Sequence, residues 1–440
     1  MRTLEYWKSR LTTVPSTIEC PEMHLLSGHD YEPPVFVGSG YINIRSSTAI
    51  DFTMFASPAD GSEAFRKLVR ARENPYEIFD QFRLVATDYE GSEWQCGWTR
   101  PELKGIPKVG WPLTGKLSSL VTQASGPWVC TDSGVELIFH PKLLLPMDKK
   151  MVSVSSIDGE EIGRRYSNGR HTVQVLDSEI TFFYTPSGES LWVTAKTSCK
   201  LQHPYLENWL GEPLRVLLGQ LAFPRLVARN FGDGTAQVWL RPSPNHYEDS
   251  CLASLMGGNI FGACTEFWEL YANLLTLIAE AKDKQGHPNF EAHQITRFYE
   301  EIIQATQGSR WVQCLTLASV GEGLTKMLMR PEERKSDFEE KDIQSLKDHI
   351  TEWKGDKNLR DRALSDIARS GEMSVGKYMR NFVERNVLKK SNERAWSKVR
   401  HSVMHGNLIG PWTTKEEDRH LLDLADLVHR LTRELISKAR

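Results

Sequence analysis

The pattern of apolar residues changes once along this chain, near residue 255, and that change constrains the fold more than any other feature. Between about residues 35 and 255, apolar residues alternate with polar ones or form short runs, which glycine, proline, serine and asparagine interrupt. After Met256-Gly-Gly-Asn259 they recur at helical spacing. A chain of 440 residues is also too long for one ordinary core. We therefore expect an α+β protein, with a β-rich region over residues 1–255 and an α-helical region over residues 256–440.

Short antiparallel strands are expected in the first region, which has room for two subdomains. Residues 82–88 and 93–98 flank a Tyr-Glu-Gly-Ser turn and predict a hairpin. Strands of this length and spacing are typical of an antiparallel sandwich or barrel. We also expect a meander formed by residues 171–176, 179–184 and 190–195, and a second hairpin formed by residues 224–229 and 235–240. Two helices are expected over residues 62–72 and 206–221.

Helical periodicity dominates the second region, and we expect a helical bundle there. The last segment carries a wide apolar stripe, which is typical of a helix packed in a bundle. Asn259, Ser374, Ser391 and Thr414 precede predicted helices and are expected to cap them. The expected helices span residues 261–278, 292–306, 311–329, 338–353, 359–370, 375–388, 392–405 and 415–438.

Tryptophans of the first region allow two interpretations. They are either large core residues, which we favour, or part of a ligand groove. The residues concerned are Trp94, Trp98, Trp111, Trp128 and Trp192.

Composition excludes several classes of protein. The seven cysteines are scattered and form no CxxC pair, which favours reduced thiols over a disulfide framework or a zinc knuckle. The chain lacks a signal-peptide core and an apolar run long enough to cross a bilayer, so we expect a cytoplasmic protein. The net charge is −3, so any nucleic-acid surface must be a local patch.

One such patch is expected near the end of the helical region. Residues 377–400 contain eight basic and two acidic residues. This basic segment predicts affinity for a polyanion. The alternative is a solvated helix face whose charge is balanced by the acidic residues at 332–340.

The basic segment ends in Arg400-His401-Ser-Val-Met-His405-Gly406-Asn407. An arginine followed five positions later by a histidine is expected by chance in a chain of this length, and Arg241 and His246 form a second example. That second example lies in a proline-rich loop. The first closes a helical, basic segment and is followed by glycine, so we take it as the candidate site.

This motif resembles the signature of the HEPN superfamily, in which an arginine, then a polar residue, then a histidine end a helical domain. The β-rich region, with residues 82–98 as its best match, looks like the amino-terminal domain of ApeA-type HEPN proteins. The resemblance implies a metal-independent endoribonuclease that acts as a homodimer in bacterial defence against phage, including abortive infection. A cell that carries such an activity needs it held off, so we expect the β-rich region to sense a trigger of phage or cellular origin and to hold the enzyme inactive until then.

The cleavage of RNA requires the residue types that this motif contains. In RNA the 2′-hydroxyl attacks the adjacent phosphate, so a catalyst must move protons and stabilise the phosphorane. Histidine serves as general acid or base, and arginine grips phosphate oxygens through its planar fork. We assign His405 as general acid or base, Arg400 as the phosphate clamp and His401 as the second polar group. The products would be a 2′,3′-cyclic phosphate and a 5′-hydroxyl, and neither a metal nor a cofactor is expected.

Further residues are assigned more weakly. Glu322, in the predicted helix 311–329, is expected to support the motif, as is Asn407. The RNA backbone, with tRNA among the candidate substrates, is expected to contact Lys389, Lys390, Arg394 and Lys398.

Helix geometry separates the motif's own side chains. At 3.6 residues per turn, Arg400 and His405 differ by about 140° around the axis. One straight helix therefore does not bring all three groups together. Either the helix ends before His405, or two chains each contribute part of the site.

Three alternatives remain open. His401 and His405 have the i, i+4 spacing of a zinc pair, but Ser402 stands where a zinc protease needs glutamate and no third ligand is evident. The motif can also be purely structural, with the histidines capping the helix. Finally, the helical region can be a catalytically silent module that binds nucleic acid or a nucleotide.

Overall fold

The structure is a computed structural model. It describes residue 7 and residues 13–28, 33–105, 110–125, 132–147, 150–155, 161–167, 169–185, 188–244, 252–289, 291–334, 336, 338–371, 373–404 and 415–438.

The chain forms two compact units, which we call the β-rich unit and the helical unit. The β-rich unit comprises Met1–Pro213, Leu221–His246 and Ile260–Glu291. The helical unit comprises Leu214–Gln220, Tyr247–Asn259 and Ala292–Arg440. The coarse prediction is therefore confirmed: the N-terminal half holds a large antiparallel β-sheet, and the C-terminal half is helical.

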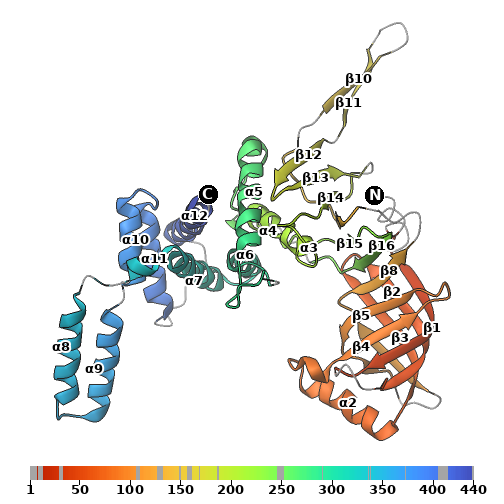
Figure 1. The fold of residues 1–440 in the computed structure, drawn as a ribbon, viewed down its shortest axis with the longest axis horizontal. Helices are drawn as coiled ribbons and strands as arrows, with labels where there is room; N and C mark the ends of the chain where they lie inside the picture. The colour runs from red at the N-terminus through yellow and green to blue at the C-terminus, as the bar shows by residue number, and fades with distance from the viewer. Residues whose placement is uncertain are drawn as a thin grey trace. The chain divides into compact units, whose positions relative to one another are not determined.

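A single sheet of fourteen strands organises the β-rich unit, in the order β12-β13-β14-β9-β15-β16-β8-β5-β4-β1-β2-β3-β7-β6 (Figure 1). The strands are β1 (Ser16–Leu26), β2 (Phe36–Ser46), β3 (Ala49–Pro58), β4 (Phe82–Thr87), β5 (Glu93–Thr99), β6 (Glu102–Leu103), β7 (Trp111–Lys116), β8 (Leu120–Ser125), β9 (Gly134–Phe139), β12 (Arg170–Val175), β13 (Ser178–Tyr184), β14 (Leu191–Lys196), β15 (Leu226–Asn230) and β16 (Thr235–Leu240). A separate hairpin pairs β10 (Lys150–Ser155) with β11 (Glu161–Ser167).

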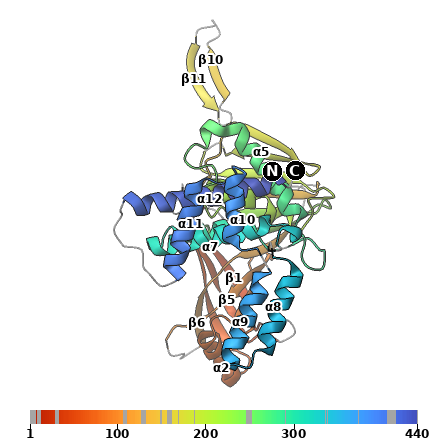
Figure 2. The same cartoon turned by 90° about the vertical axis from the view of Figure 1, so that its left-hand side faces the viewer.

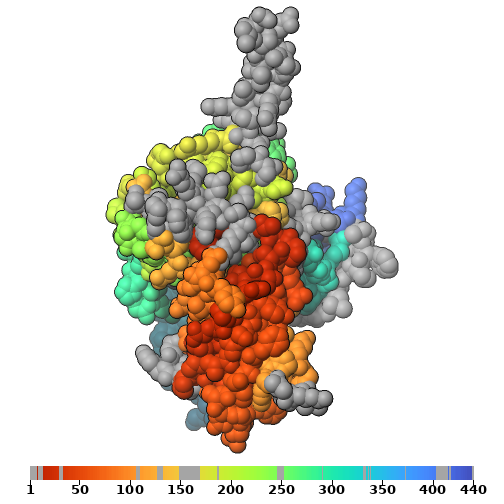
Figure 3. Space-filling view, turned by 90° about the vertical axis from the view of Figure 1, so that its right-hand side faces the viewer, coloured from red at the N-terminus to blue at the C-terminus, as the bar shows by residue number. Residues whose placement is uncertain are grey.

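The predicted hairpins and the meander are confirmed. β4 pairs with β5, β15 with β16, and β12, β13 and β14 follow one another antiparallel. Alternation explains the first hairpin, because every second side chain of β4 is buried. The core beneath these strands includes Phe36, Phe52, Phe82 and Trp94, all at most 1% exposed. In the space-filling view the N-terminal strands, coloured red to orange, form one continuous packed surface (Figure 3).

The prediction of one long helix over residues 206–221 was wrong. The structure has two short helices instead, α3 (Leu206–Trp209) and α4 (Glu212–Leu218). The first predicted helix, by contrast, is confirmed as α2 (Gly61–Glu73). Asp60 caps α2, since its carboxylate accepts hydrogen bonds from the backbone N–H groups of Ser62 and Glu63.

Every helix predicted after residue 256 has a counterpart in the structure. They are α5 (Cys264–Glu280), α6 (Gln294–Ala305), α7 (Arg310–Leu328), α8 (Glu340–Glu352), α9 (Lys357–Ser370), α10 (Val375–Glu384), α11 (Lys390–Met404) and α12 (Lys415–Lys438). The described residues also form short 3-10 turns at Ile78–Asp80, Phe261–Ala263 and Pro331–Arg334. Of these helices, α5 belongs to the β-rich unit.

Of the four predicted helix caps, one is confirmed, two are wrong and one lies outside the described residues. Ser374 caps α10 as expected, because its hydroxyl accepts a hydrogen bond from the backbone N–H of Lys377. Asn259 does not cap α5, which begins five residues later. The prediction for Ser391 was also wrong, because this residue lies inside α11, where its hydroxyl donates a hydrogen bond to Asp423 of α12. Thr414 lies outside the described residues.

Helix α7 is central to the helical unit, since it packs against α6, α10, α11 and α12 (Figure 2). Trp396 of α11 is 4% exposed, and its indole N–H donates to the carbonyl of Ala318 on α7 at 3.0 Å. Gly321 permits a close approach of α12, because an added Cβ would lie 2.5 Å from the side chain of Leu427. The first contact fixes α11 against the middle of α7, and the second brings α12 close to the same helix.

Within the described residues, no helix is long and apolar enough to span a membrane.

Replacing Trp396 with alanine is expected to destabilise the helical unit by about 3–5 kcal/mol, because a large buried ring and its hydrogen bond are lost. Trp353→Ala is the matched control, because that ring is 42% exposed and its loss should cost below about 1 kcal/mol. Urea unfolding followed by helical circular dichroism measures both. Equal losses in the two variants would contradict the packing described for α11.

Candidate functional site

Arg400 lies on α11 and is directed against α7. Its Nε donates a hydrogen bond to Oε2 of Glu322 at 3.1 Å. Its guanidinium also lies 5.4 Å from the ring centroid of Trp396, one helical turn earlier. The Arg400 side chain nevertheless remains 49% exposed. A buried ring and a carboxylate thus orient a cation that is still open to solvent.

Glu322 holds a second cation as well. Its other oxygen, Oε1, pairs with Nζ of Lys326 at 2.8 Å, one turn further along α7. Burial raises the pKa of the Glu322 carboxyl, but the hydrogen bonds and charges of Lys326 and Arg400 outweigh that effect, and the pKa is lowered from its ordinary value of 4.5. At neutral pH Glu322 is therefore a carboxylate shared by two cations.

These groups line an open groove of about 700 Å³, which we call the Arg400 groove. Among the described residues, four cations and one acid lie along it. The described lining residues are Glu322, Lys326, Met329, Arg334, Arg369, Met373, Ser374, Val375, Gly376, Trp396 and Arg400. Such a surface attracts an anion, and the guanidinium groups supply planar forks that suit phosphate oxygens.

His401 does not line this groove. It is exposed on α11 and differs from Arg400 by about 100° around the helix axis. It shares its face instead with Lys390, Arg394 and Lys398, which precede it at intervals of three or four residues and are also exposed. The structure therefore separates the first two motif residues onto different faces of one helix.

The remaining motif residues, His405, Gly406 and Asn407, lie outside the described residues. The same holds for His246 of the second arginine–histidine pair. Its partner Arg241 is largely buried, and burial lowers its pKa.

Of the four basic residues expected to contact RNA, none lines the Arg400 groove. Lys390, Arg394 and Lys398 form the exposed face shared with His401. Lys389 pairs its Nζ with Oδ2 of Asp426 on α12 at 3.1 Å.

Sequence reasoning missed Lys326, Arg334 and Arg369. Only Lys326 left a signal in the sequence, since it follows Glu322 by four residues and so lies on the same helix face. Arg334 and Arg369 come from the Pro331–Arg334 turn and from α9, and nothing in their local sequence marks them.

Among the residues that the structure describes, no group of three or more His, Cys, Asp or Glu side chains could hold a metal ion. The zinc-like spacing of His401 and His405 remains a sequence pattern, because His405 is outside the described range.

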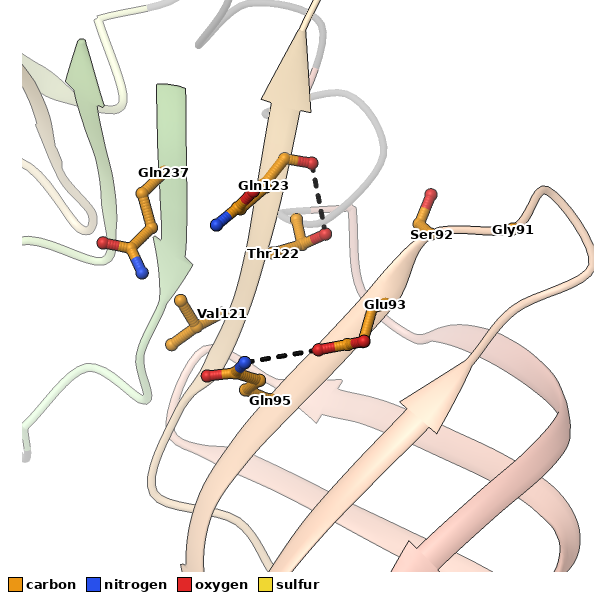
Figure 4. A pocket seen from close by; sticks show the side chains of 8 residues that line it. All are labelled: Gly91, Ser92, Glu93, Gln95, Val121, Thr122, Gln123 and Gln237. Atoms are coloured by element: carbon orange, nitrogen blue, oxygen red, sulfur yellow. Dashed lines mark hydrogen bonds between the residues drawn. The ribbon is translucent and has the colours of Figure 1, made fainter. Parts of the chain in front are cut away.

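A second cavity, of about 320 Å³, lies in the β-rich unit (Figure 4). Three of its polar lining residues are amides from β5, β8 and β16, namely Gln95, Gln123 and Gln237. Glu93 accepts a hydrogen bond from Gln95 at 3.2 Å. None of the described lining residues is a histidine, lysine, arginine or cysteine, so these residues offer neither a general base of the histidine type nor a phosphate clamp.

Comparisons of the chain with family models, with curated proteins and with solved structures returned no match.

The Glu322 contacts generate a pH prediction. Because the pKa of this carboxyl is lower in the folded state, its ionised form stabilises the protein above about pH 4.5, and that stabilisation is lost as the pH falls below this value. At pH 7, Glu322→Gln should lower the free energy of unfolding by about 1 kcal/mol. The difference from wild type should shrink between pH 4.5 and pH 3, as measured by urea unfolding at each pH.

Glu384→Gln is the matched control, because Glu384 is exposed and has no ion pair among the described residues. A Glu322→Gln deficit that is unchanged at pH 3 would show that the carboxylate does not act through its charge.

Proposed function

We propose that this protein is a metal-independent endoribonuclease of the HEPN type, which cleaves RNA through attack by the 2′-hydroxyl. The observation that carries the proposal is Arg400 itself. It belongs to the motif that resembles the HEPN signature, it is oriented by Glu322, and it opens into a groove with three further cations.

In this mechanism the RNA phosphate occupies the Arg400 groove. Arg400 presents its fork to the phosphate oxygens and stabilises the charge that develops on the phosphorane. Glu322 orients the guanidinium and does not contact the substrate. Lys326, Arg334 and Arg369 attract the flanking phosphates. His405 moves the protons, as general base for the 2′-hydroxyl or general acid for the leaving 5′-oxygen.

The proposal includes a homodimer. Arg400 and His401 lie on different faces of α11, so a second protomer is the simplest source of an imidazole that faces the Arg400 groove. An isologous pair of helical units would then contain two equivalent composite sites.

The biological setting is also part of the proposal. An RNase of this kind harms its own cell, so the β-rich unit would hold it inactive until a trigger of phage or cellular origin arrives. This places the protein in antiviral defence by abortive infection, with transfer RNA among the candidate substrates.

A catalytically silent binding module is the second candidate. It is favoured by the Arg400–Glu322 ion pair, because a structural contact between α7 and α11 would look the same. The exposed face formed by Lys390, Arg394, Lys398 and His401 would also suit nucleic-acid binding without cleavage.

Alanine at Arg400 or at His405 is expected to reduce RNA cleavage by about 100-fold or more, because each removes a group that acts only in the transition state. Arg400→Lys should recover little activity, since an ammonium lacks the planar fork. Cleavage of labelled RNA in EDTA is the measurement. The matched control is Arg362→Ala, an exposed arginine on α9 outside the groove.

Two results would contradict the nuclease. One is the absence of cleavage by wild-type dimer in the presence of its trigger. The other is cleavage that survives in the Arg400→Ala variant. Loss of RNA binding in a protein that never cleaves would favour the silent module.

A complementation experiment tests the composite site. Mixing inactive Arg400→Ala protomers with inactive His405→Ala protomers should restore activity. In each mixed dimer, one of the two sites then combines an intact arginine from one chain with an intact histidine from the other. Recovery of up to about one quarter of wild-type activity is expected, as random exchange makes half of the dimers mixed and each then holds one complete site of two. No recovery, with exchange confirmed by tagged protomers, would place both groups in one chain.

A further inference from the structure

The β-rich unit contains a groove of about 670 Å³, distinct from the cavity in Figure 4, which we call the Trp98 groove. It lies over the ends of β2, β3, β5 and β7. Its lining residues are Arg45, Asp51, Gln81, Trp98, Thr99, Arg100, Glu102, Lys104, Thr114, Gly115, Lys116, Leu117 and Ser118.

An irregularity in β5 brings Trp98 to this groove. Trp94 and Cys96 are fully buried, so strict alternation would bury Trp98 as well. The register between β4 and β5 shifts between Arg83 and Val85, and Gly97 adopts a φ of 58°. This bulge inverts the alternation, so Thr99 is buried and Trp98 stays partly exposed. A large aromatic side chain is thus turned out of the core and into a groove.

Trp98 is also supported from the neighbouring strand. The guanidinium of Arg83 on β4 lies 5.5 Å from the ring centroid of Trp98. An indole held in place in this way can stack with a planar ligand at a low cost in side-chain entropy.

The charged side chains around Trp98 are mostly cations, and most of these cations form no ion pair with a described residue. Of the four cations among the described lining residues, Arg45 forms an ion pair with Asp51. Asp51 in turn accepts a hydrogen bond from Asn43 at 3.0 Å. The other three cations, Arg100, Lys104 and Lys116, are exposed and form no ion pair with any described residue. Among the described lining residues, Glu102 is the one acid that Arg45 does not pair with.

We propose that the Trp98 groove binds a nucleotide unit, with its base stacked on Trp98 and its phosphates on Arg100, Lys104 and Lys116. An aromatic platform beside a row of cations is the arrangement by which proteins bind single-stranded nucleic acid without sequence preference. A neutral sugar would not use three cations, and a simple inorganic anion would not use the indole. The nucleotide is either free or part of a single strand.

This binding site does not depend on the proposed nuclease activity. It lies in the β-rich unit, and none of its residues belongs to the Arg400 groove. Its test uses a DNA probe without a 2′-hydroxyl, which the proposed reaction cannot cleave, so either proposal can fail while the other stands.

The experiment measures fluorescence anisotropy of a labelled ten-residue oligothymidylate with the full chain, at a series of salt concentrations. Lys104→Glu combined with Lys116→Glu should weaken binding at least about tenfold, and it should reduce the slope of log K against log salt by about 1.4, the loss of two phosphate contacts. Trp98→Leu should weaken binding at least about fivefold without changing the slope, whereas Trp98→Phe should retain most of it.

The matched control is Lys282→Glu combined with Lys284→Glu, two exposed lysines of the same unit outside the groove. ATP separates the two sources: competition by ATP assigns the groove to a free nucleotide, and its failure to compete assigns it to a strand. Equal effects of the two lysine pairs, or wild-type affinity in Trp98→Leu, would overturn the proposal.

Discussion

The carboxylate of Glu322 is the contact on which the candidate site depends, because it joins two helices and orients two cations at once. One oxygen accepts a hydrogen bond from Arg400 on α11, and the other pairs with Lys326 on its own helix. Burial of the carboxylate is offset by its contacts with the two cations, and the Arg400 side chain remains 49% exposed and open to the groove. The packing of Trp396 against α7 brings the two helices to the distance at which this contact forms.

Local rules predicted most of the fold because most segments follow one period throughout. The hairpin of β4 and β5 and the helix α7 needed no tertiary information beyond alternation and helical spacing. The failures arose where a tertiary contact overrode the local pattern. Gly97 introduces a bulge that sends Trp98 outward, which period-two counting cannot foresee. Ser391 resembled a cap, yet its hydroxyl is used by Asp423, thirty-two residues later in the chain.

The candidate site could be predicted only in part. The sequence motif predicts Arg400 as the phosphate clamp, and the sequence also predicts Glu322 as its support. The structure places these two side chains together. It does not place His401 with them, and the reason is the helix itself, whose neighbouring residues point about 100° apart. Arg334 and Arg369 reach the groove from distant segments, and a linear pattern carries no information about such convergence.

The chemistry of the RNA ends tests the account most directly, because the ends record how the phosphate was attacked. Purified protein and its trigger would be incubated with total RNA in EDTA, and the new ends would be mapped. The account predicts 2′,3′-cyclic phosphates paired with 5′-hydroxyls, as attack by the neighbouring hydroxyl requires. New ends that carry 5′-phosphates and 3′-hydroxyls, or cleavage that stops when the chelator is added, would contradict it.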